Sequence, residues 1–361
     1  MNLRRAFLAI LLSLSAPLSI SAAAPGSPQY LNWYRCNTHT HTSARPGSDA
    51  NESPDFVAQW YRAHGYQCLV ITDHENFTDV APVNAKYATD GHFLVIPGQE
   101  ITQTLPDPTH LGGVRHLHIN GINTDRLILP LTAPVGMPPS EIYERNIAAI
   151  RAAGGIPQIN HPNLLWSVHP EDLLPLKEPF LLEIWNAFPT SNNLGGVDSA
   201  GHQSLSTEAL WDRLLSKGQR IWGVASDDAH AYHSFDDRES PTPGKGWIVV
   251  QAPSLSVQNI VTALRAGRFY ASTGIALERY SVDRDGISIQ IAQSHEWSPA
   301  LKPSALYTTR FIGANGDLLA EITGLSPQYR FKGDEPYVRA SIMDSDGRRA
   351  WTQPVFRVTR P

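Results

Sequence analysis

The chain has 361 residues, of which 42% are hydrophobic, and this is enough apolar material for a large buried core without disulfide or metal support. The formal net charge is -5, and no run of Lys or Arg occurs, so duplex nucleic acid is not expected as a partner. These values favour one large domain with a smaller one, acting on a small molecule.

Residues 1–24 are predicted to be a cleaved signal peptide. Arg4 and Arg5 precede an apolar stretch over residues 6–20, and small residues follow where a signal peptidase cuts. A membrane anchor is the alternative, but the stretch is short for a bilayer and Pro17 interrupts it. We therefore expect a secreted or periplasmic protein that has no membrane anchor after cleavage.

From about residue 30, short β-branched or aromatic runs alternate with amphipathic segments, as in βα units. Ser53 and Gly65 mark the two ends of the first predicted helix. Strands are predicted at 33–38, 66–72, 92–97, 114–120, 156–160, 180–185, 220–225 and 248–251, and helices at 54–64, 140–153, 207–217 and 257–266. Parallel strands joined in this way form a barrel or an open sheet, and reactive groups belong at the carboxyl ends of the strands.

The helical pattern ends near residue 281. Alternating runs at 287–291, 307–312 and 337–342 are accompanied by Asp-Gly and Asn-Gly pairs, which are typical of β-hairpins. We therefore predict two domains, a barrel over residues 30–277 and a small all-β domain, a β-sandwich, over residues 281–361.

The chain has two cysteines, Cys36 and Cys68, both in predicted core strands. An exported protein can form a disulfide between them. Buried free thiols are the slightly preferred interpretation, because free cysteine is a common core residue. Neither cysteine belongs to a CxxC pair, so thiolate metal binding is not supported.

Polar side chains with metal-binding chemistry follow one predicted strand after another. Each histidine or acid alone is more often a surface or core residue than a ligand, but the joint pattern predicts a metal site. These residues are His39, His41, Asp73, His74, Glu100, His161, Glu183, Asp227, Asp228 and His230, with His116 and His118 on or just after the fourth strand.

Histidine and carboxylate ligands without cysteine favour a multinuclear hydrolytic site that holds Zn, Mn or Fe. Neighbouring cations lower the pKa of a shared water molecule and hold the attacking and leaving oxygens together. Phosphoryl transfer benefits most, because its catalysis consists mainly of positioning and charge neutralisation.

Five motifs in order resemble those of the PHP (polymerase and histidinol phosphatase) superfamily, and the similarity is strongest to its CehA/McbA-like metallohydrolase branch. It covers about residues 33–275 and extends into the C-terminal region at 337–340 and 350–352. The motifs are His39-Thr40-His41-Thr42, Ile71-Thr72-Asp73-His74, Pro97-Gly98-Gln99-Glu100, Asn160-His161-Pro162 and Ser226-Asp227-Asp228-Ala229-His230.

The resemblance implies a distorted seven-stranded (β/α) barrel that binds two or three divalent metal ions. It assigns His39, His41, Glu100 and Asp228 to the first metal, Glu100, His116 and His161 to the second, and His74 with His230 to the third. His116 is preferred over His118 as the ligand. Many relatives place a histidine shortly after the His-x-His pair, whereas this chain has residues 45–49 there, and Asp49 is the possible substitute in the third site.

Further residues are expected near the metals. Asp73, Asp227, Glu183 and Asn186 are candidates for catalytic residues or for groups that orient the ligands, with a simple strand-end hydrogen bond as the alternative. Possible substrate-binding residues are Arg45 and Arg115, the cations that could face a phosphate, and Trp185, which could form an apolar wall with Trp166 or Phe188.

The leading hypothesis is a metal-dependent hydrolase of phosphomonoesters or phosphodiesters. Hydrolysis of a carboxylic or carbamate ester is the second enzyme candidate, and a metal-dependent extracytoplasmic binding protein is the non-enzyme candidate. An amidohydrolase also begins with His-x-His, but the chain offers no convincing bridging lysine and ends the motif set in Asp-x-His rather than a single Asp.

Overall fold

The computed structural model describes residues 31–198, 201–235, 237, 239–293 and 306–356. The described residues belong to one compact unit by their contacts. The predicted signal peptide lies outside the described residues. Among those described, no helix is both long and apolar enough to cross a membrane.

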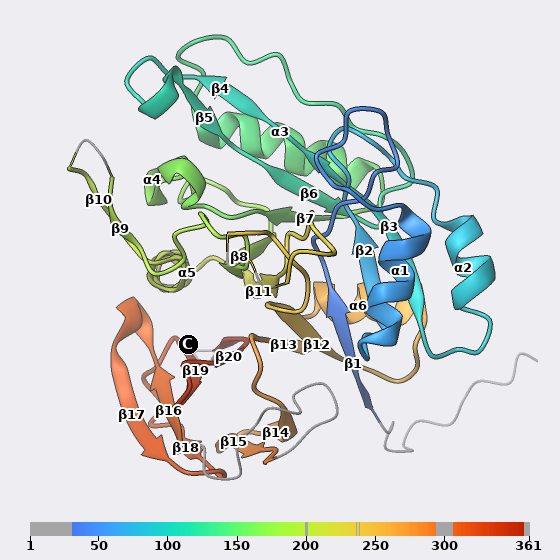
Figure 1. Ribbon diagram of the computed structural model, residues 1–361. Helices are drawn as coiled ribbons and strands as arrows, with labels where there is room; N and C mark the ends of the chain where they lie inside the picture. Colours follow the sequence, from blue (N-terminus) through green and yellow to red (C-terminus); the bar gives the residue numbers. More distant parts are fainter. Residues whose placement is uncertain (1–30, 199–200, 236, 238, 294–305, 357–361) are drawn as a thin grey trace, which may run out of the picture. The chain divides into compact units, whose positions relative to one another are not determined.

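One long mixed sheet organises this unit (Figure 1). Its strands follow the order β11-β8-β7-β6-β3-β2-β1-β12-β13-β20-β19-β16-β17, and β21 pairs with β19. The bounds are β1 (Asn32–Asn37), β2 (Cys68–Ile71), β3 (Leu94–Ile101), β6 (Ile119–Ile122), β7 (Ile156–Ile159), β8 (Leu181–Asn186), β11 (Trp222–Ser226), β12 (Trp247–Ala252), β13 (Phe269–Ser272), β16 (Tyr307–Ile312), β17 (Leu318–Thr323), β19 (Tyr337–Asp344), β20 (Arg349–Thr352) and β21 (Val355–Phe356).

The strands of the main sheet run in both directions, so the parallel arrangement expected for the βα units is found in only part of it. β1, β2 and β3 are parallel, and so are β7, β8 and β11. β6 lies antiparallel between β3 and β7, and β12 is antiparallel to β1. The amino end of β6 therefore lies at the same edge of the sheet as the carboxyl ends of β3 and β7.

The predicted helices form, and serine caps begin three of them. The side chains of Ser53, Ser206 and Ser256 accept hydrogen bonds from the first turns of α1, α5 and α6. A helix at α2 was not predicted, and no side chain caps its start. The bounds are α1 (Pro54–Ala63), α2 (Ala81–Tyr87), α3 (Pro139–Ala152), α4 (Pro170–Leu173), α5 (Thr207–Ser216) and α6 (Val257–Arg265), with 3-10 turns η1 (Leu111–Gly113), η2 (Leu164–Trp166) and η3 (Ala314–Gly316).

The sheet curls so that β11, at one end of the strand order, contacts β12 and β13. Gln353, which directly follows β20, hydrogen-bonds to Gly223 of β11. Its side-chain N–H donates to the carbonyl of Gly223, and its side-chain oxygen accepts from the N–H of Gly223, both at 2.8 Å. A mixed α/β fold with a large sheet is thus observed, while the seven-stranded count of the barrel stays a prediction.

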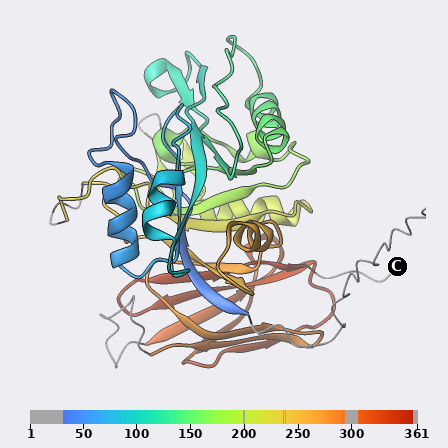
Figure 2. The ribbon, with the colours of Figure 1, turned by 90° about the vertical axis from the view of Figure 1, so that its right-hand side faces the viewer.

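The C-terminal strands β16, β17, β19, β20 and β21 continue the main sheet, because β13 pairs with β20 across the predicted domain boundary. In Figure 2 the orange and red strands lie together at the bottom of the view. Asn315 and Gly316 both have positive φ and form the turn between β16 and β17, as their sequence indicated. The remaining sheets are β14 (Leu277–Val282) with β15 (Gly286–Ile291) and β18 (Gln328–Arg330), β4 (Thr104–Pro106) with β5 (Val114–His116), and β9 (Gly196–Val197) with β10 (Gln203–Ser204).

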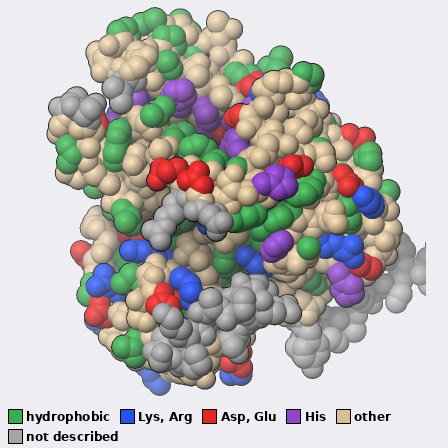
Figure 3. All heavy atoms as spheres, in the orientation of Figure 1, with side chains coloured by type: hydrophobic (Ala, Val, Ile, Leu, Met, Phe, Trp, Pro, Cys, Tyr) green, Lys and Arg blue, Asp and Glu red, His purple; other side chains and the backbone are tan. Residues whose placement is uncertain are grey.

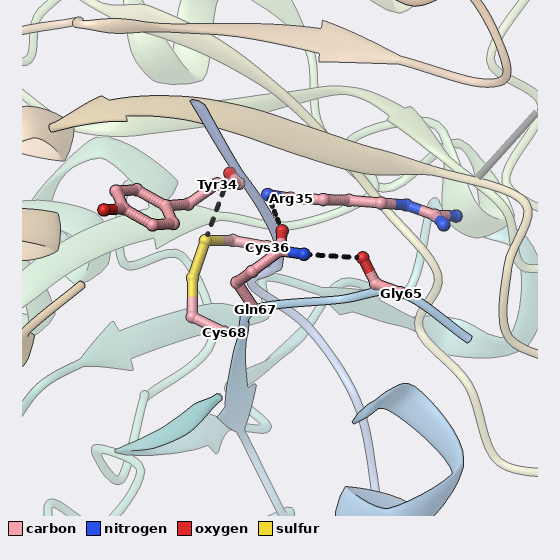
Figure 4. The surroundings of a disulfide bond; sticks show 6 residues. All are labelled: Tyr34, Arg35, Cys36, Gly65, Gln67 and Cys68. Carbon is pink, nitrogen blue, oxygen red and sulfur yellow. Dashed lines mark hydrogen bonds between the residues drawn. A yellow bond between two sulfur atoms is a disulfide. The ribbon is translucent and has the colours of Figure 1, made fainter. Parts of the chain in front are cut away.

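Cys36 and Cys68 form a disulfide (Figure 4), so the preferred interpretation of buried free thiols is wrong. The two residues lie directly opposite each other in the parallel pair β1 and β2, with their Cα atoms 4.5 Å apart. This separation lies within the range that a disulfide spans. The sequence could not show this register, because it does not reveal which residues of two strands face each other.

Candidate metal centre

Histidine and carboxylate side chains from separate strand ends meet in one buried cluster. Glu100 lies in β3, and the others follow or precede strands at the same edge of the sheet. His39 and His41 follow β1, His74 follows β2, His118 precedes β6, His161 follows β7, and Asp228 and His230 follow β11. Figure 3 shows several histidine side chains at the surface in the upper half of the view.

The first set of donors, group A, consists of His39, His41, Glu100 and Asp228. Nε2 of His39 lies 3.0 Å from Nε2 of His41, 3.3 Å from Oε2 of Glu100 and 3.2 Å from Oδ1 of Asp228. Nε2 of His41 lies 3.4 Å and 3.1 Å from the same two oxygens. All four side chains are buried, so their donor atoms face a common point away from bulk water.

Group B consists of Glu100, His118 and His161. Oε1 of Glu100 lies 3.2 Å from Nδ1 of His118 and 3.3 Å from Nε2 of His161. Glu100 therefore directs one carboxylate oxygen to group A and the other to group B, as the sequence-based bridging assignment requires.

Group C consists of His41, Asp49, His74 and His230. Oδ2 of Asp49 lies 3.3 Å from Nε2 of His74 and 3.5 Å from Nε2 of His230. The centroid of the His41 ring lies 4.4 Å from that of His74 and 4.2 Å from that of His230, and the rings of His74 and His230 are 6.0 Å apart, so the three imidazoles contact one another as a triangle. The side chain of Asp49 is 55% exposed, which makes group C the most open of the three.

Glu183 orients two of the donors. Its Oε1 accepts a hydrogen bond from Nδ1 of His39 at 2.8 Å, which turns Nε2 of His39 toward group A. Its Oε2 accepts from the backbone N–H of His161 at 2.6 Å and from the side chain of Asn186 at 2.8 Å. Asn186 also donates to Oδ2 of Asp228 at 3.1 Å. Glu183 and Asn186 thus hold the donors in position.

Asp73 and Asp227 point away from the donor groups. Asp73 accepts from the N–H and hydroxyl of Thr42 at 2.6 Å and 2.8 Å, and fixes the chain just after His41. Asp227 accepts from Asn37 at 2.6 Å, Tyr61 at 3.0 Å and the N–H of Gly246 at 2.8 Å. Both are strand-end hydrogen-bonding groups in this structure.

Two donors have left-handed backbone conformations that non-glycine residues rarely adopt. The φ angle is 51° at Asp228 and 23° at His161. Such conformations are unfavourable and persist when the surroundings fix them, as is common at functional sites. At Asp228 the backbone N–H donates to the carbonyl of His39 at 3.0 Å, so the turn after β11 is tied to the His-x-His segment.

The electrostatics of the cluster keep the carboxylates ionised. Burial would raise the pKa of Glu100, but His39, His74 and His118 hold it well below its ordinary value. Burial and the neighbouring His230 and His74 lower the pKa of His41 to about 3, so this imidazole is neutral. Neutral imidazole and ionised carboxylate are the forms that bind metal ions.

His118, and not His116, lies next to Glu100, which corrects the preferred ligand of group B. The expected single strand at 114–120 is two strands, β5 and β6. His116 ends β5, which pairs with β4 outside the main sheet, whereas His118 immediately precedes β6, in which Asn120 faces Glu100. Because β6 is antiparallel, its ligand precedes the strand instead of following it.

The expected substrate-binding residues differ in their surroundings. Arg115 is buried, donates to the carbonyl of Ser167 at 2.7 Å and pairs with Asp172, so it does not face the cluster. Trp185 packs against Trp351, with their ring centroids 5.9 Å apart. Arg45 is half-buried. Phe188 instead lies beside the cluster, with its ring 5.6 Å from that of His230.

Asn160 is a supporting residue whose role was not apparent from the sequence. Its side chain donates to Oε1 of Glu100 at 2.8 Å and to Asn120 at 2.9 Å. Gln158, two residues earlier in β7, donates to Oε1 of Glu183 at 3.1 Å. The available signal was the Asn160-His161-Pro162 motif, which placed Asn160 beside a ligand.

The donor set fits divalent metal ions. The two Nε2 atoms of His39 and His41 face each other beside two carboxylate oxygens, an arrangement that one proton cannot satisfy but a cation can. Among the described residues, neither ring nitrogen of the buried His118 has a hydrogen-bond partner, although Nδ1 faces Glu100. Buried charge and unpaired polar atoms are costly unless a partner or metal compensates them.

No protein-family model and no curated protein matches the sequence. A two-domain protein from Bacteroides vulgatus, described as containing a predicted PHP-like metal-dependent phosphoesterase, is 15% identical with a TM-score of 0.42, and the match covers 87% of this chain and 90% of that one. A candidate metal-dependent phosphoesterase from Bifidobacterium adolescentis is 14% identical with a TM-score of 0.38, and the match covers 64% of this chain and 94% of that one. Because both TM-scores are low, the assignment of the centre rests on its own donor set.

Proposed function

We propose that the protein is a metal-dependent hydrolase that cleaves phosphomonoesters or phosphodiesters, and that it belongs to the PHP superfamily, in its CehA/McbA-like branch. The observation that carries the proposal is the buried Glu100, which directs its two oxygens to two separate groups of donors, A and B. A carboxylate shared between two metal sites is typical of multinuclear hydrolytic centres.

In this proposal, groups A and B hold one divalent cation each, with His118 replacing His116 as the ligand in group B. Group C holds a third, with Asp49 in the place of the histidine expected from the resemblance. Zn, Mn and Fe suit this mixture of imidazole and carboxylate. When bound, such cations activate water and neutralise charge on phosphoryl oxygens.

The chain's own residues position these groups. Glu183 fixes the ring of His39, Asn160 fixes Glu100, and Asn186 fixes Asp228. Each of these hydrogen bonds is buried, so the donors are held in place before any substrate arrives.

Hydrolysis of a carboxylic or carbamate ester is the second candidate, and two observations favour it. Arg115 is engaged by Asp172, which leaves Arg45 as the remaining cation that the sequence nominated for a phosphate. The ring of Phe188 beside His230 offers an apolar surface at the open side of the cluster, which suits an aryl or alkyl group.

The proposal includes export, because the first 24 residues have the pattern of a signal peptide. The partner is then a small ester outside the cytoplasm. The non-enzyme alternative is an exported protein that uses the metals only to bind a ligand.

Elemental analysis of the purified protein, combined with a chromogenic panel of phosphoesters, carboxylic esters and carbamates, tests the proposal. We expect two to three equivalents of transition metal, and turnover that His39→Ala or Glu100→Gln abolishes together with metal binding while the fold remains. Glu178→Gln is the control, because Glu178 is an exposed residue paired with Arg151. Metal without turnover of any panel member would favour the binding protein, and full activity in Glu100→Gln would refute the bridging role.

A further inference from the structure

The segment from Val114 to His118 directs two histidines to one side of the chain. The side chain of Arg115 points to Ser167 and Asp172, and Leu117 is buried in the hydrophobic core. The pairing with the neighbouring strand continues past β5, because the N–H of Leu117 donates to the carbonyl of Gln103 at 2.7 Å. Side chains alternate along an extended chain, so His116 and His118 share the opposite side, which faces Glu100.

His116 lies further from Glu100 than His118 and is more exposed. The centroids of the two imidazole rings are 5.6 Å apart. His118 is 8% exposed and contacts Glu100, whereas His116 is half-buried. Among the residues that the structure describes, the ring nitrogens of His116 have no hydrogen-bond partner. This imidazole therefore lies beside group B, next to His118, with its ring nitrogens available to a ligand.

Group B is the donor set next to His116, and it is incomplete. Glu100, His118 and His161 supply three donors, one fewer than in groups A and C. Catalytic metal sites commonly have three protein ligands and leave a position for water or substrate. The 3-10 turn η2, which follows His161, contacts β5. His116 and this turn therefore flank group B.

We propose that His116 binds the substrate, and that its imidazole makes a hydrogen bond to a phosphoryl oxygen held on the group B side of the centre. This inference rests on the proposed phosphoesterase function. It assigns two roles to the His116-Leu117-His118 sequence: His118 holds the metal, and His116 holds the substrate. With a phosphomonoester as substrate, the same imidazole would contact the product, inorganic phosphate.

The two roles predict different losses in two matched variants, His116→Gln and His118→Gln. Each variant removes one imidazole from the same five-residue segment. His92→Gln is the control, because His92 is exposed and lies outside the cluster. Three properties are measured on each purified protein: metal content by elemental analysis, binding of inorganic phosphate to the metal-loaded protein by calorimetry, and kcat/KM for a phosphoester.

We expect His116→Gln to keep the metal content of the wild type while phosphate binding and kcat/KM each fall about tenfold or more, as for the loss of one good hydrogen bond in a desolvated site. His118→Gln should lose about one metal equivalent, and His92→Gln should resemble the wild type. Unchanged phosphate binding in His116→Gln, or the loss of a metal equivalent in that variant, would overturn the inference. If the wild type itself neither binds phosphate nor cleaves phosphoesters, the proposed function fails, and the assignment of His116 fails with it.

Discussion

The orientation of His39 shows how a single residue sets the geometry of the centre. Its Nδ1 donates to Glu183, and its Nε2 faces Glu100 and Asp228. Burial would lower the pKa of His39, but Asp228, Glu183 and Glu100 together raise it well above its ordinary value. The ring therefore lies in a strongly negative environment, which also attracts a divalent cation.

Replacing Glu183 with Gln should weaken metal binding without removing a ligand. The amide cannot accept the hydrogen bond from His39 as strongly as the carboxylate, so the ring loses its fixed orientation. We expect about a 10- to 100-fold loss of metal affinity, measured by competition with a chromogenic chelator. Glu178→Gln serves as the control, since the side chain of Glu178 is 62% exposed, whereas that of Glu183 is buried. Wild-type affinity in Glu183→Gln would show that His39 is oriented by other contacts.

Glu335 provides a prediction about pH that is independent of any metal. Burial would raise its pKa, but the N–H groups of Lys332 and Gly333 and the hydroxyl of Tyr329 lower it to about 2. Because the pKa is lower in the folded state, the carboxylate stabilises the protein above about pH 4.5, and this contribution is lost as the pH falls through about 2.

Glu335→Gln should therefore lower the free energy of unfolding at pH 7, by on the order of 3 kcal/mol at most. The difference from the wild type should shrink as the pH is lowered from 4.5 toward 3. Urea denaturation at several pH values measures it, and Asp334→Asn, which changes an exposed neighbour, is the control. A difference that is independent of pH would contradict the assignment.

At the scale of elements, α5 is joined to β19 by a buried ion pair. Arg339 is fully buried, and its Nε and Nη2 donate to the two carboxylate oxygens of Asp212 at 2.7 Å and 2.5 Å. Its Nη1 donates to Glu208 at 2.8 Å. The helix before β11 is thereby tied to a C-terminal strand, which explains how the two predicted domains share one unit.

Asp212→Ala should destabilise the protein by about 3–5 kcal/mol, because it removes the bidentate partner of Arg339 and leaves this buried guanidinium only partly paired. Chemical denaturation measures the loss. In the same helix, Arg213 forms an exposed pair with Glu171, and Arg213→Ala should cost about 1 kcal/mol or less. Similar losses in the two variants would show that the buried pair is not an important connection.

At the scale of the whole molecule, the disulfide and the continuous sheet limit how the chain can unfold. The Cys36–Cys68 bond closes a loop with a sequence separation of 32 residues that contains His39, His41 and Asp49. A loop of this size reduces the entropy of the unfolded chain by an amount worth about 3–4 kcal/mol.

The double variant Cys36→Ala/Cys68→Ala should lose about 2–4 kcal/mol of unfolding free energy, measured by urea denaturation. Its metal content should stay at the wild-type level, because neither sulfur lies in the donor groups. Reduced wild-type protein is the matched comparison, since it keeps the side-chain volume. If removing the bond also removed metal, the disulfide would be needed to shape the centre.

Much of the centre could be predicted from the sequence, because its metal-binding side chains are histidines and carboxylates that lie beside the ends of predicted strands. His39, His41, Glu100, His161, Asp228 and His230 were all nominated, and the structure brings them together. Helices α1, α3, α5 and α6 were predicted because apolar periodicity is a local signal, and Ser53 marked the start of α1. The acidic charge balance follows from composition alone, whereas the signal peptide over residues 1–24 stays a prediction.

The tertiary structure decided what depends on strand direction and register. The antiparallel orientation of β6 placed His118 rather than His116 beside Glu100, and the register of β1 on β2 paired the two cysteines. The fold of the 43–52 segment brought Asp49 to His74 and His230. These outcomes result from contacts between residues far apart in the chain, and local sequence patterns carry no information about which strands will be neighbours.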